Sequence, residues 1–519
     1  MKNLLLLTLA GGLAGSAPAA AQATEKLDAA ALAKIRDEGM NRSKVMETAF
    51  YLTDVNGPRL ANSDGLKRAN EWTKGQLTKY GLVNANIEAW GNFGRGWDIE
   101  KSYLALTVPY YQPMIGAPKA WTPSTPGPVR RRVVLVKATI EADLAAYKGQ
   151  LRDKIVVMSV AAPLKPGTEG AIRRYADEDL KKMGDPAAPR PVSNILDAAA
   201  LATRKAQAAL RTALAEMLVS EGVAGVLSAR GGIYGTFNTS NGASYAADAK
   251  PVLPEMETAP EDQLRLIRLV EAGVPVEVEM ETKTRFQTQD LKGYNVVAEI
   301  PGTDKKLKSE VVMLGGHLDS WHAATGATDN AAGCAVMLEA VRILKATGLK
   351  PRRTIRIALW GEEEQGLHGS RNYVKNHFAD PATMQLKPDH EKLAAYFNLD
   401  NGGGKIRGIY AQGNEAVAPI FGEWLKPFAD LGASTVTLRN TGSTDHIAFD
   451  AVGLPGFQFI QDGLDYFPIT HHTNQDTYDR LIADDLKQAS VVVASFVYDA
   501  AMRDQKLPRK ALPAAAKPQ

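Results

Sequence analysis

Residues 354–366 read "TIRIALWGEEEQG", a short and largely apolar run that ends in a glycine followed by three consecutive glutamates. The apolar part has the length and the alternation of a strand, and the glycine is a typical place for a strand to end. Three carboxylates at the end of a strand have two interpretations. They form a solvated surface loop, or they belong to a metal site that carries its own base.

Other segments of the same kind surround this strand along the chain. They are short apolar strands separated by helical or loop segments, and they read "YNVVAEI", "EVVMLGGH", "AAYFNLD" and "LPGFQFI". Such alternation is typical of a doubly wound α/β sheet. The sequence therefore predicts an α/β catalytic domain with a doubly wound mixed sheet over residues 286–505. In sheets of this class, ligands bind beyond the carboxyl ends of the strands.

Side chains that can bind metal collect where these predicted strands end. They are His317, Asp319, Asp329, the glutamate run, Asp400, His471 and His472. Each has an ordinary explanation when it stands alone. Asp329 caps a helix, Asp400 forms a turn, and the glutamate run is solvated. One shared site explains their common placement better than a separate explanation for each.

The donor set contains histidines and carboxylates, which suit one or two zinc-like divalent ions. One carboxylate can bridge two ions about 3.5–4 Å apart, and a water between them then becomes a nucleophile at neutral pH. A nearby carboxylate that does not bind metal can accept the proton of this water. Neighbouring glutamates at a strand end point in different directions, so one can bind metal while the next faces the water.

The motifs resemble those of a known family in both order and spacing. "GGHLDSW", "GATDNAAG", "WGEEEQGLHGS", "NLDN" and "HHTNQDT" resemble those of the co-catalytic zinc exopeptidases, which include bacterial aminopeptidases, glutamate carboxypeptidase and carboxypeptidase Q. The resemblance spans residues 317–477 and implies two zinc ions per chain. It implies that the ions are held by His317 and Asp400, by Glu364 and His472, and by a bridging Asp329.

The same resemblance implies further roles. Glu363 is expected to be the base, and Asp319 is expected to steady His317. Glu362, the first glutamate of the run, is then expected to be solvated.

Some residues depart from the family pattern or extend it. Several aminopeptidases have a tyrosine before the last metal histidine, whereas this chain has His471, as in the carboxypeptidase Q branch. The stretch "GSTDHIAF" resembles a substrate-side loop of the family. Asp445, His446 and His471 are therefore candidate substrate contacts, with structural packing as the alternative for Asp445 and His446. No feature of the sequence decides which end of a peptide is removed.

The rest of the chain divides into four parts. Residues 1–23 resemble a signal peptide with cleavage after Ala23, and their apolar run is too short to span a membrane. We therefore expect an exported protein, periplasmic or extracellular. Residues 24–114 are expected to be the N-terminal part of the peptidase domain, and 115–285 resemble an inserted protease-associated domain. Residues 506–519 are expected to be a disordered tail.

Composition limits the classes of partner. Over 519 residues the formal net charge is only +3, which gives no field for nucleic acid or for acidic membranes. Cys334 is the only cysteine, so an intrachain disulfide and a cysteine-based zinc site are both excluded. Its apolar neighbours predict a buried structural thiol. Peptides are the expected substrates, and a homodimer is one assembly to test.

Three functions are consistent with this fold. The first is a zinc-dependent metalloexopeptidase, either an aminopeptidase or a carboxypeptidase. The second is an inactive binding or receptor protein on the same fold, but such proteins lack ligands or base, and all of them are present here. The third is a zinc acyltransferase resembling glutaminyl cyclase, which uses one zinc ion and commonly lacks the insertion. The first function is our prediction.

Overall fold

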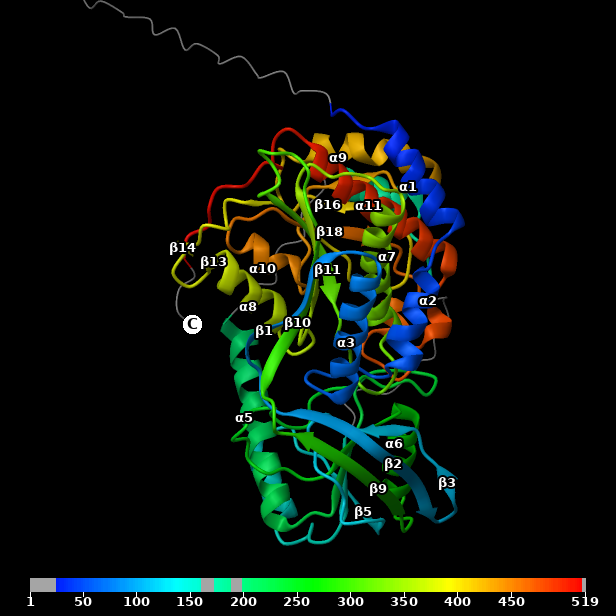
Figure 1. Cartoon of the computed structure of the whole chain (residues 1–519). Coiled ribbons are helices and arrows are strands. Elements are labelled where there is room, and N and C mark those ends of the chain that lie inside the picture. The colour runs from blue at the N-terminus through cyan, green and yellow to red at the C-terminus, as the bar shows by residue number, and fades with distance from the viewer. Residues whose placement is uncertain (1–24, 160–171, 188–197, 516–519) are drawn as a thin grey trace, which may run out of the picture.

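The computed structural model describes residues 25–159, 172–187 and 198–515. These residues form two units, each built on an eight-stranded sheet (Figure 1). The first unit is the upper one in Figure 1 and contains the predicted site. The second unit, within residues 96–287, lies below it, whereas residues 172–187 of that range pack on the first unit. The expected signal peptide lies outside the described residues.

The first sheet has the following strand order and bounds: β1 (Val83–Asn92), β10 (Lys292–Ile300), β12 (Thr354–Trp360), β11 (Val311–His317), β15 (Leu393–Asn398), β18 (Gly456–Gln461), β16 (Ile406–Tyr410) and β17 (Thr435–Thr437). The four central strands β12, β11, β15 and β18 run parallel to one another. Their carboxyl ends therefore meet at the same edge of the sheet. The outer pairings include antiparallel ones, so the sheet is mixed, as the sequence predicts.

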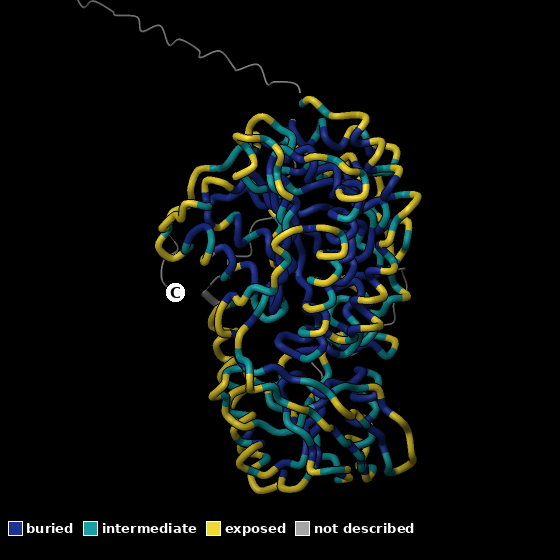
Figure 2. Tube along the Cα trace, in the orientation of Figure 1, coloured by how far each residue is buried: buried dark blue, intermediate teal, exposed yellow. Residues whose placement is uncertain are grey.

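Both faces of the first sheet are buried, which explains why its central strands are continuous apolar runs. Successive residues of a strand point to opposite faces. Leu314 accordingly packs with α7 and α11, while Met313 packs on the other side with α8 and α10. Figure 2 shows these buried residues gathered inside the upper unit and exposed residues around its outside. The helices of this unit are α1 (Ala29–Asn41), α2 (Val45–Phe50), α3 (Asp64–Lys79), α7 (Ala332–Ala346), α8 (His368–His377), α9 (Ala418–Leu425), α10 (His446–Asp450) and α11 (Ala483–Met502).

Helix α3 illustrates how local sequence sets an element. The hydroxyl of Ser63 accepts the backbone N–H of Leu66 at 3.2 Å, and so caps the first turn. Gly81, just beyond the helix, has φ of +80°, a conformation that glycine adopts without strain. A small hairpin after α8 completes the unit, with β13 (Ala379–Asp380) and β14 (Gln385–Leu386).

The second sheet has the following strand order and bounds: β3 (Gln112–Pro113), β2 (Gly96–Val108), β9 (Glu277–Gln287), β5 (Val129–Val136), β6 (Ile155–Met158), β7 (Gly225–Ser228), β8 (Glu255–Thr258) and β4 (Gly116–Pro118). Helix α6 (Pro260–Glu271) packs on one face and α5 (Ala198–Glu221) on the other. The long strand β9 pairs antiparallel with β2 and β5.

The chain crosses between the units twice, after β1 and before β10. At this crossing the amide of Asn62 donates to the carbonyl oxygens of Gly94 and Asp290, both at 2.8 Å. The second sheet thus begins at Gly96, whereas the sequence placed the boundary at residue 115. Residues 109–128 are rich in proline and glycine, but they carry β3 and β4 and connect β2 to β5 of the same sheet instead of linking two units.

Two segments contact the first unit in addition. Residues 172–187 contain α4 (Asp177–Gly184), and Arg174 beside that helix pairs with Asp462 and Asp485 of the first unit. The tail expected to be disordered from residue 506 packs on the first unit over its described part. Leu507 is buried, and Arg509 donates to the carbonyl oxygen of Leu393 at 2.8 Å.

In the part of the chain that the structure describes, no helix combines the length and the apolar character required to cross a bilayer.

Candidate functional site

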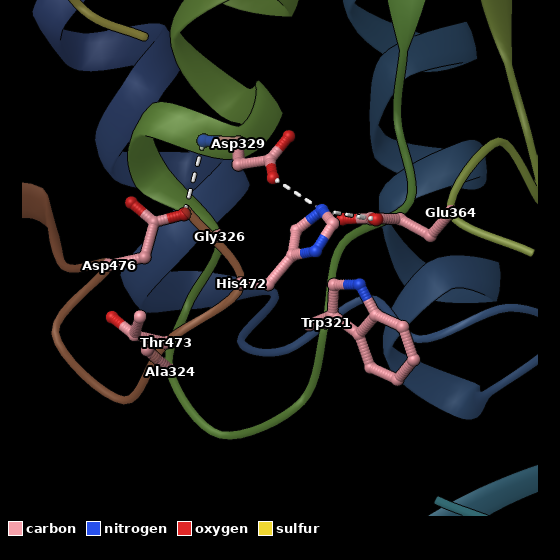
Figure 3. A pocket seen from close by; sticks show the side chains of 8 residues that line it. All are labelled: Trp321, Ala324, Gly326, Asp329, Glu364, His472, Thr473 and Asp476. Carbon is pink, nitrogen blue, oxygen red and sulfur yellow. Dashed lines mark hydrogen bonds and ion pairs between the residues drawn. The ribbon is translucent and has the colours of Figure 1, made fainter. Parts of the chain in front are cut away.

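The predicted site residues come together at the carboxyl ends of the parallel strands. His317 is the last residue of β11, the glutamate run follows β12, and Asp400 follows β15. Asp329 lies in the short kinked segment Ala327–Ala331 that leads into α7, and its own backbone is not helical. His472 lies in the loop between β18 and α11 and reaches back toward these residues (Figure 3).

Asp329 lies between two histidines from different parts of the chain. Its Oδ1 is 3.2 Å from His317 Nε2, and its Oδ2 is 3.3 Å from His472 Nε2. Each histidine has a second carboxylate beside it. His317 Nε2 is 3.3 Å from Asp400 Oδ1, and His472 Nε2 is 3.0 Å from Glu364 Oε2. The arrangement is two His–carboxylate pairs joined by one shared aspartate.

The chemistry of these groups fits divalent cations. Ligand atoms of His317, Asp329 and Asp400 all lie within 4.8 Å of one another, as do those of Asp329, His471 and His472. Asp329 Oδ2 and Glu364 Oε1 are buried and have no hydrogen-bond partner among the described residues. The contact of Asp329 Oδ2 with His472 is an ion pair at 3.3 Å. Buried carboxylate oxygens without donors are costly unless a cation compensates them.

Electrostatics within the cluster leads to the same conclusion. Burial raises the pKa of Glu364 to about 7, and nearby Asp329 raises it while His472 lowers it. Burial lowers the pKa of His472, but Glu364 and Asp329 overcome this effect and raise the pKa to about 11. These opposing shifts arise because His472 lies close to both carboxylates.

The three glutamates of the opening motif have different surroundings. Glu364 lies beside His472, as described. Burial raises the pKa of Glu363 well above its ordinary value, nearby His317 lowers it, and Asp400 raises it. Glu362 is buried rather than solvated, which corrects the expectation from sequence. It accepts a hydrogen bond from Trp90 Nε1 at 3.0 Å, and burial raises its pKa to about 8.

Asp319 is connected to both the histidine and the glutamates. Its backbone oxygen lies 3.1 Å from His317 Nδ1. Its carboxylate accepts the backbone N–H of Glu363 at 3.1 Å and that of Glu364 at 3.2 Å. The same carboxylate lies 3.6 Å from His317 Nδ1, so the Asp319 side chain holds the turn after β12 and also faces the histidine.

Asp476 is part of the site, although sequence reasoning did not single it out. Its carboxylate accepts the backbone N–H of Thr328 at 2.6 Å and that of Asp329 at 3.1 Å. Asp476 thereby fixes the main chain that carries the bridging aspartate. It also lines a small pocket that Figure 3 shows beside His472, together with Trp321, Ala324, Gly326, Asp329, Glu364 and Thr473. Its place in "HHTNQDT", four residues after the candidate ligand His472, is the signal that was available.

The three candidate substrate residues are placed differently from one another. The His471 ring stacks on His472 with ring centres 3.7 Å apart. Asp445 is fully buried, and burial raises its pKa to about 7 while nearby His317 lowers it. His446 is also buried, and its Nε2 lies 2.6 Å from the amide nitrogen of Gln412. This contact ties His446 to the protein interior.

Cys334 is buried in α7, as predicted, and its thiol donates to the carbonyl oxygen of His317 at 2.9 Å. Burial raises the pKa of this thiol to about 12. A thiol with so high a pKa is not a nucleophile at neutral pH.

The chain is similar to known proteins. Residues 295–497 match the model of Peptidase family M28. Carboxypeptidase Q of Mus musculus is 26% identical over 475 residues, which are 91% of this chain and 88% of that protein.

Two solved structures share the fold across both units. The Peptidase M28 precursor of Shewanella amazonensis has a TM-score of 0.65 and 23% identity, and covers 93% of this chain and 98% of its own. A zinc aminopeptidase of Bacillus subtilis has a TM-score of 0.53 and 18% identity, and covers 89% of this chain and 96% of its own. The family match falls on the strands that carry the two His–carboxylate pairs, so residues 295–497 are similar to peptidase family M28, and the chain is a metallo-exopeptidase.

Proposed function

We propose that this chain is an exported exopeptidase that uses two zinc ions to hydrolyse terminal bonds of peptides or dipeptides. The observation that carries this proposal is Asp329, whose two oxygens lie 3.2 and 3.3 Å from histidines of separate pairs. A carboxylate in that position is suited to bridge two ions. Zinc is the metal because histidine and carboxylate donors suit it, and because a solved neighbour is a zinc aminopeptidase.

Each pair would hold one ion. His317 and Asp400 would bind the first, Glu364 and His472 would bind the second, and Asp329 would bind both. Zinc bound in this way would supply Lewis-acid polarisation of the scissile carbonyl and lower the pKa of the attacking water.

Glu363 is the proposed general base. Its carboxyl is buried beside Glu364 and close to Asp400, while Asp319 fixes its main chain. It would accept a proton as water attacks the peptide carbonyl carbon, and it would then donate that proton to the nitrogen of the departing amine. The bond between the carbonyl carbon and that nitrogen breaks, which leaves a carboxylate and a free amine.

The candidate substrate residues remain proposals with different support. His471 stacks on His472 and is partly exposed, so it is placed to contact a bound peptide. Asp445 would act on the site at close range through its charge, since His317 and Asp400 affect its pKa. His446 would support the site from the protein interior.

We also propose that residues 96–287 are the protease-associated insertion, although the sequence placed its start at residue 115. The support is that this unit contacts the loop carrying His472, so it is placed beside the site. There it would limit access to chain ends. Export rests on the N-terminal sequence alone, and mass spectrometry of the secreted protein tests cleavage after Ala23. Light scattering tests the expectation of a homodimer.

The test measures zinc content and hydrolysis for the wild type and for Glu363→Gln. Two sets of blocked dipeptides are used, one with a free amino end and one with a free carboxyl end. We expect about two zinc ions per chain in both proteins, and a fall in kcat of about 10²- to 10⁴-fold in the variant. The set that the wild type cleaves identifies the end that is removed.

Other outcomes favour the alternatives. Zinc binding without cleavage of either set favours a binding protein on the same fold. Cyclisation of peptides that begin with glutamine, at one zinc ion per chain, favours an acyltransferase. A wild type that binds no zinc overturns the metal site.

A further inference from the structure

The loop that carries His472 is held by the second unit. We call residues 471–474 the His472 loop. The carbonyl oxygen of His472 accepts the backbone N–H of Thr239 at 2.7 Å and the Thr239 hydroxyl at 3.1 Å. The carbonyl oxygen of His471 accepts the side-chain amide of Asn238 at 3.1 Å. Asn238 also forms an antiparallel bridge with Thr473.

Asn474 adds a reciprocal contact to the same segment. Its Oδ1 accepts the backbone N–H of Phe237 at 3.0 Å, and its Nδ2 donates to the carbonyl oxygen of Gly235 at 3.1 Å. The segment 235–239 therefore acts as a short docking strand for the His472 loop.

The docking strand is fixed within the second unit. The hydroxyl of Ser240 donates to Glu257 on β8 at 3.1 Å, and the backbone N–H of Ala120 donates to the carbonyl oxygen of Ser240 at 3.2 Å. Phe237 is buried. Movement of the second sheet relative to the first would therefore displace the His472 loop or break its hydrogen bonds to residues 235–239.

His472 needs this support because of its own backbone. It has φ of +59°, in the left-handed region that a side chain with a Cβ adopts only at a cost. Such a conformation persists where the surroundings fix it. Thr239 donates both of its hydrogen bonds to the carbonyl oxygen of His472, the residue with this strained backbone.

The other histidine has no such dependence. His317 ends β11, and its Nδ1 lies 3.1 Å from the backbone oxygen of Asp319. The carbonyl oxygen of its partner Asp400 accepts the side-chain amide of Gln458 on β18 at 3.0 Å. All of these residues belong to the first unit. Both His–carboxylate pairs thus belong to the first unit, but among the described residues only the pair with His472 includes a loop that the second unit holds.

We propose that Asn238, Thr239 and Asn474 are positioning residues for the metal ligand His472, and that the two metal positions are for this reason unequal. The inference rests on the proposed function, in which His472 binds zinc. The position between Glu364 and His472 depends on contact between the units, whereas the position between His317 and Asp400 does not. Weakening the contact between the units therefore lowers zinc affinity at the position between Glu364 and His472 and leaves the other position unchanged.

The experiment measures zinc affinity of the metal-free full-length chain by competition with a chromophoric chelator. The variants are Thr239→Val, which removes the hydroxyl but keeps the backbone donor, and Asn474→Asp, which keeps the acceptor for Phe237 but loses the donor to Gly235. We expect the tighter zinc equivalent to bind as in the wild type. We expect the weaker equivalent to lose about 10- to 100-fold in affinity, as is usual when a supporting contact of a metal ligand is removed.

Two further proteins make the result specific. Thr239→Ser restores the hydroxyl and is expected to restore the affinity. Tyr245→Phe removes a different contact between the units, the 3.1 Å hydrogen bond of the Tyr245 hydroxyl to His368, and is expected to leave both affinities unchanged. Cobalt titration gives a second readout, since the visible absorption of the second equivalent should change in Thr239→Val while that of the first stays constant.

The outcomes are distinguishable. Wild-type affinity for both equivalents in Thr239→Val and Asn474→Asp overturns this inference and leaves the proposed function standing. Equal weakening of both equivalents, or a lowered melting temperature of the metal-free variants, indicates general loosening and also overturns it. A wild type that takes up no zinc overturns the proposed function, and this inference with it.

Discussion

The carboxylate of Asp319 accepts the backbone N–H of Glu363 at 3.1 Å, and its second oxygen accepts that of Glu364 at 3.2 Å. The Asp319 side chain thus fixes the backbone N–H groups of both glutamates, the proposed base Glu363 and the proposed ligand Glu364. In Asp319→Asn, one acceptor oxygen is replaced by an amide that also donates. We expect kcat/KM to fall about 10- to 100-fold and zinc affinity to fall with it.

The matched control is Asp304→Asn. The Asp304 carboxylate also accepts two backbone N–H groups, those of Lys306 and Leu307, at 2.8 and 3.1 Å, but it lies in a turn away from the site. Steady-state kinetics on the two variants separates the roles. Equal activity of Asp319→Asn and the control would contradict the role of Asp319.

The shared position of Asp329 predicts a pattern of metal loss. Asp329→Ala should weaken both zinc equivalents, because its two oxygens face different histidines. Asp400→Ala and His472→Ala should each weaken one equivalent and spare the other. Zinc titration of the three variants checks this pattern. Loss of a single equivalent in Asp329→Ala would show that the aspartate does not bridge.

Glu362 and Glu363 should respond differently to the same substitution. Gln at position 362 retains an oxygen that can accept the hydrogen bond of Trp90, so Glu362→Gln should change kcat less than about tenfold. Glu363→Gln removes the proposed base and should lower kcat by about 10²- to 10⁴-fold. Both are measured on the peptide that the wild type cleaves. A larger loss at Glu362 than at Glu363 would reverse the assignment.

Asp499, on α11 and away from the site, predicts a pH dependence of stability. Burial, with Glu25 and Asp28 nearby, raises the pKa of Asp499 well above its usual value. The folded state therefore binds this proton more tightly than the unfolded state does. Its contribution to stability is fully present below the unfolded pKa and is lost as pH rises through the folded pKa.

Asp499→Asn removes this proton dependence. Because one oxygen of Asp499 is buried without a hydrogen-bond partner, its ionised form is unfavourable in the fold. The variant should melt at a higher temperature than the wild type at pH 8, and the difference should shrink toward pH 4. Melting curves at these two pH values are the measurement. A difference that grows toward low pH would contradict the sign.

Sequence alone located the candidate site well, for a physical reason. The parallel strands are buried on both faces and read as apolar runs, so their ends are visible in the sequence. Parallel strands gather their carboxyl ends at one edge, and His317, Asp329 and Asp400 therefore had to lie close together once the strands were recognised. The roles of the remaining candidate ligands rest on the order of the motifs and stay predictions.

What sequence missed are contacts between distant residues. Glu362 looked solvated because Trp90, its partner, lies 272 positions away. Asp476 reaches the main chain of Asp329 across 147 positions. The boundary at residue 115 was misplaced because turns within a sheet and a linker between units share the same proline- and glycine-rich composition.

The crossing between the units has a consequence for the order of folding. The second unit has all of its strands once residue 287 has emerged. In contrast, β1 must wait for its neighbour β10, and α1 must wait for α11 near the end of the chain. Long loops must close before these late contacts form. The second unit can therefore be complete first, and it then offers a finished surface on which the His472 loop is ordered last.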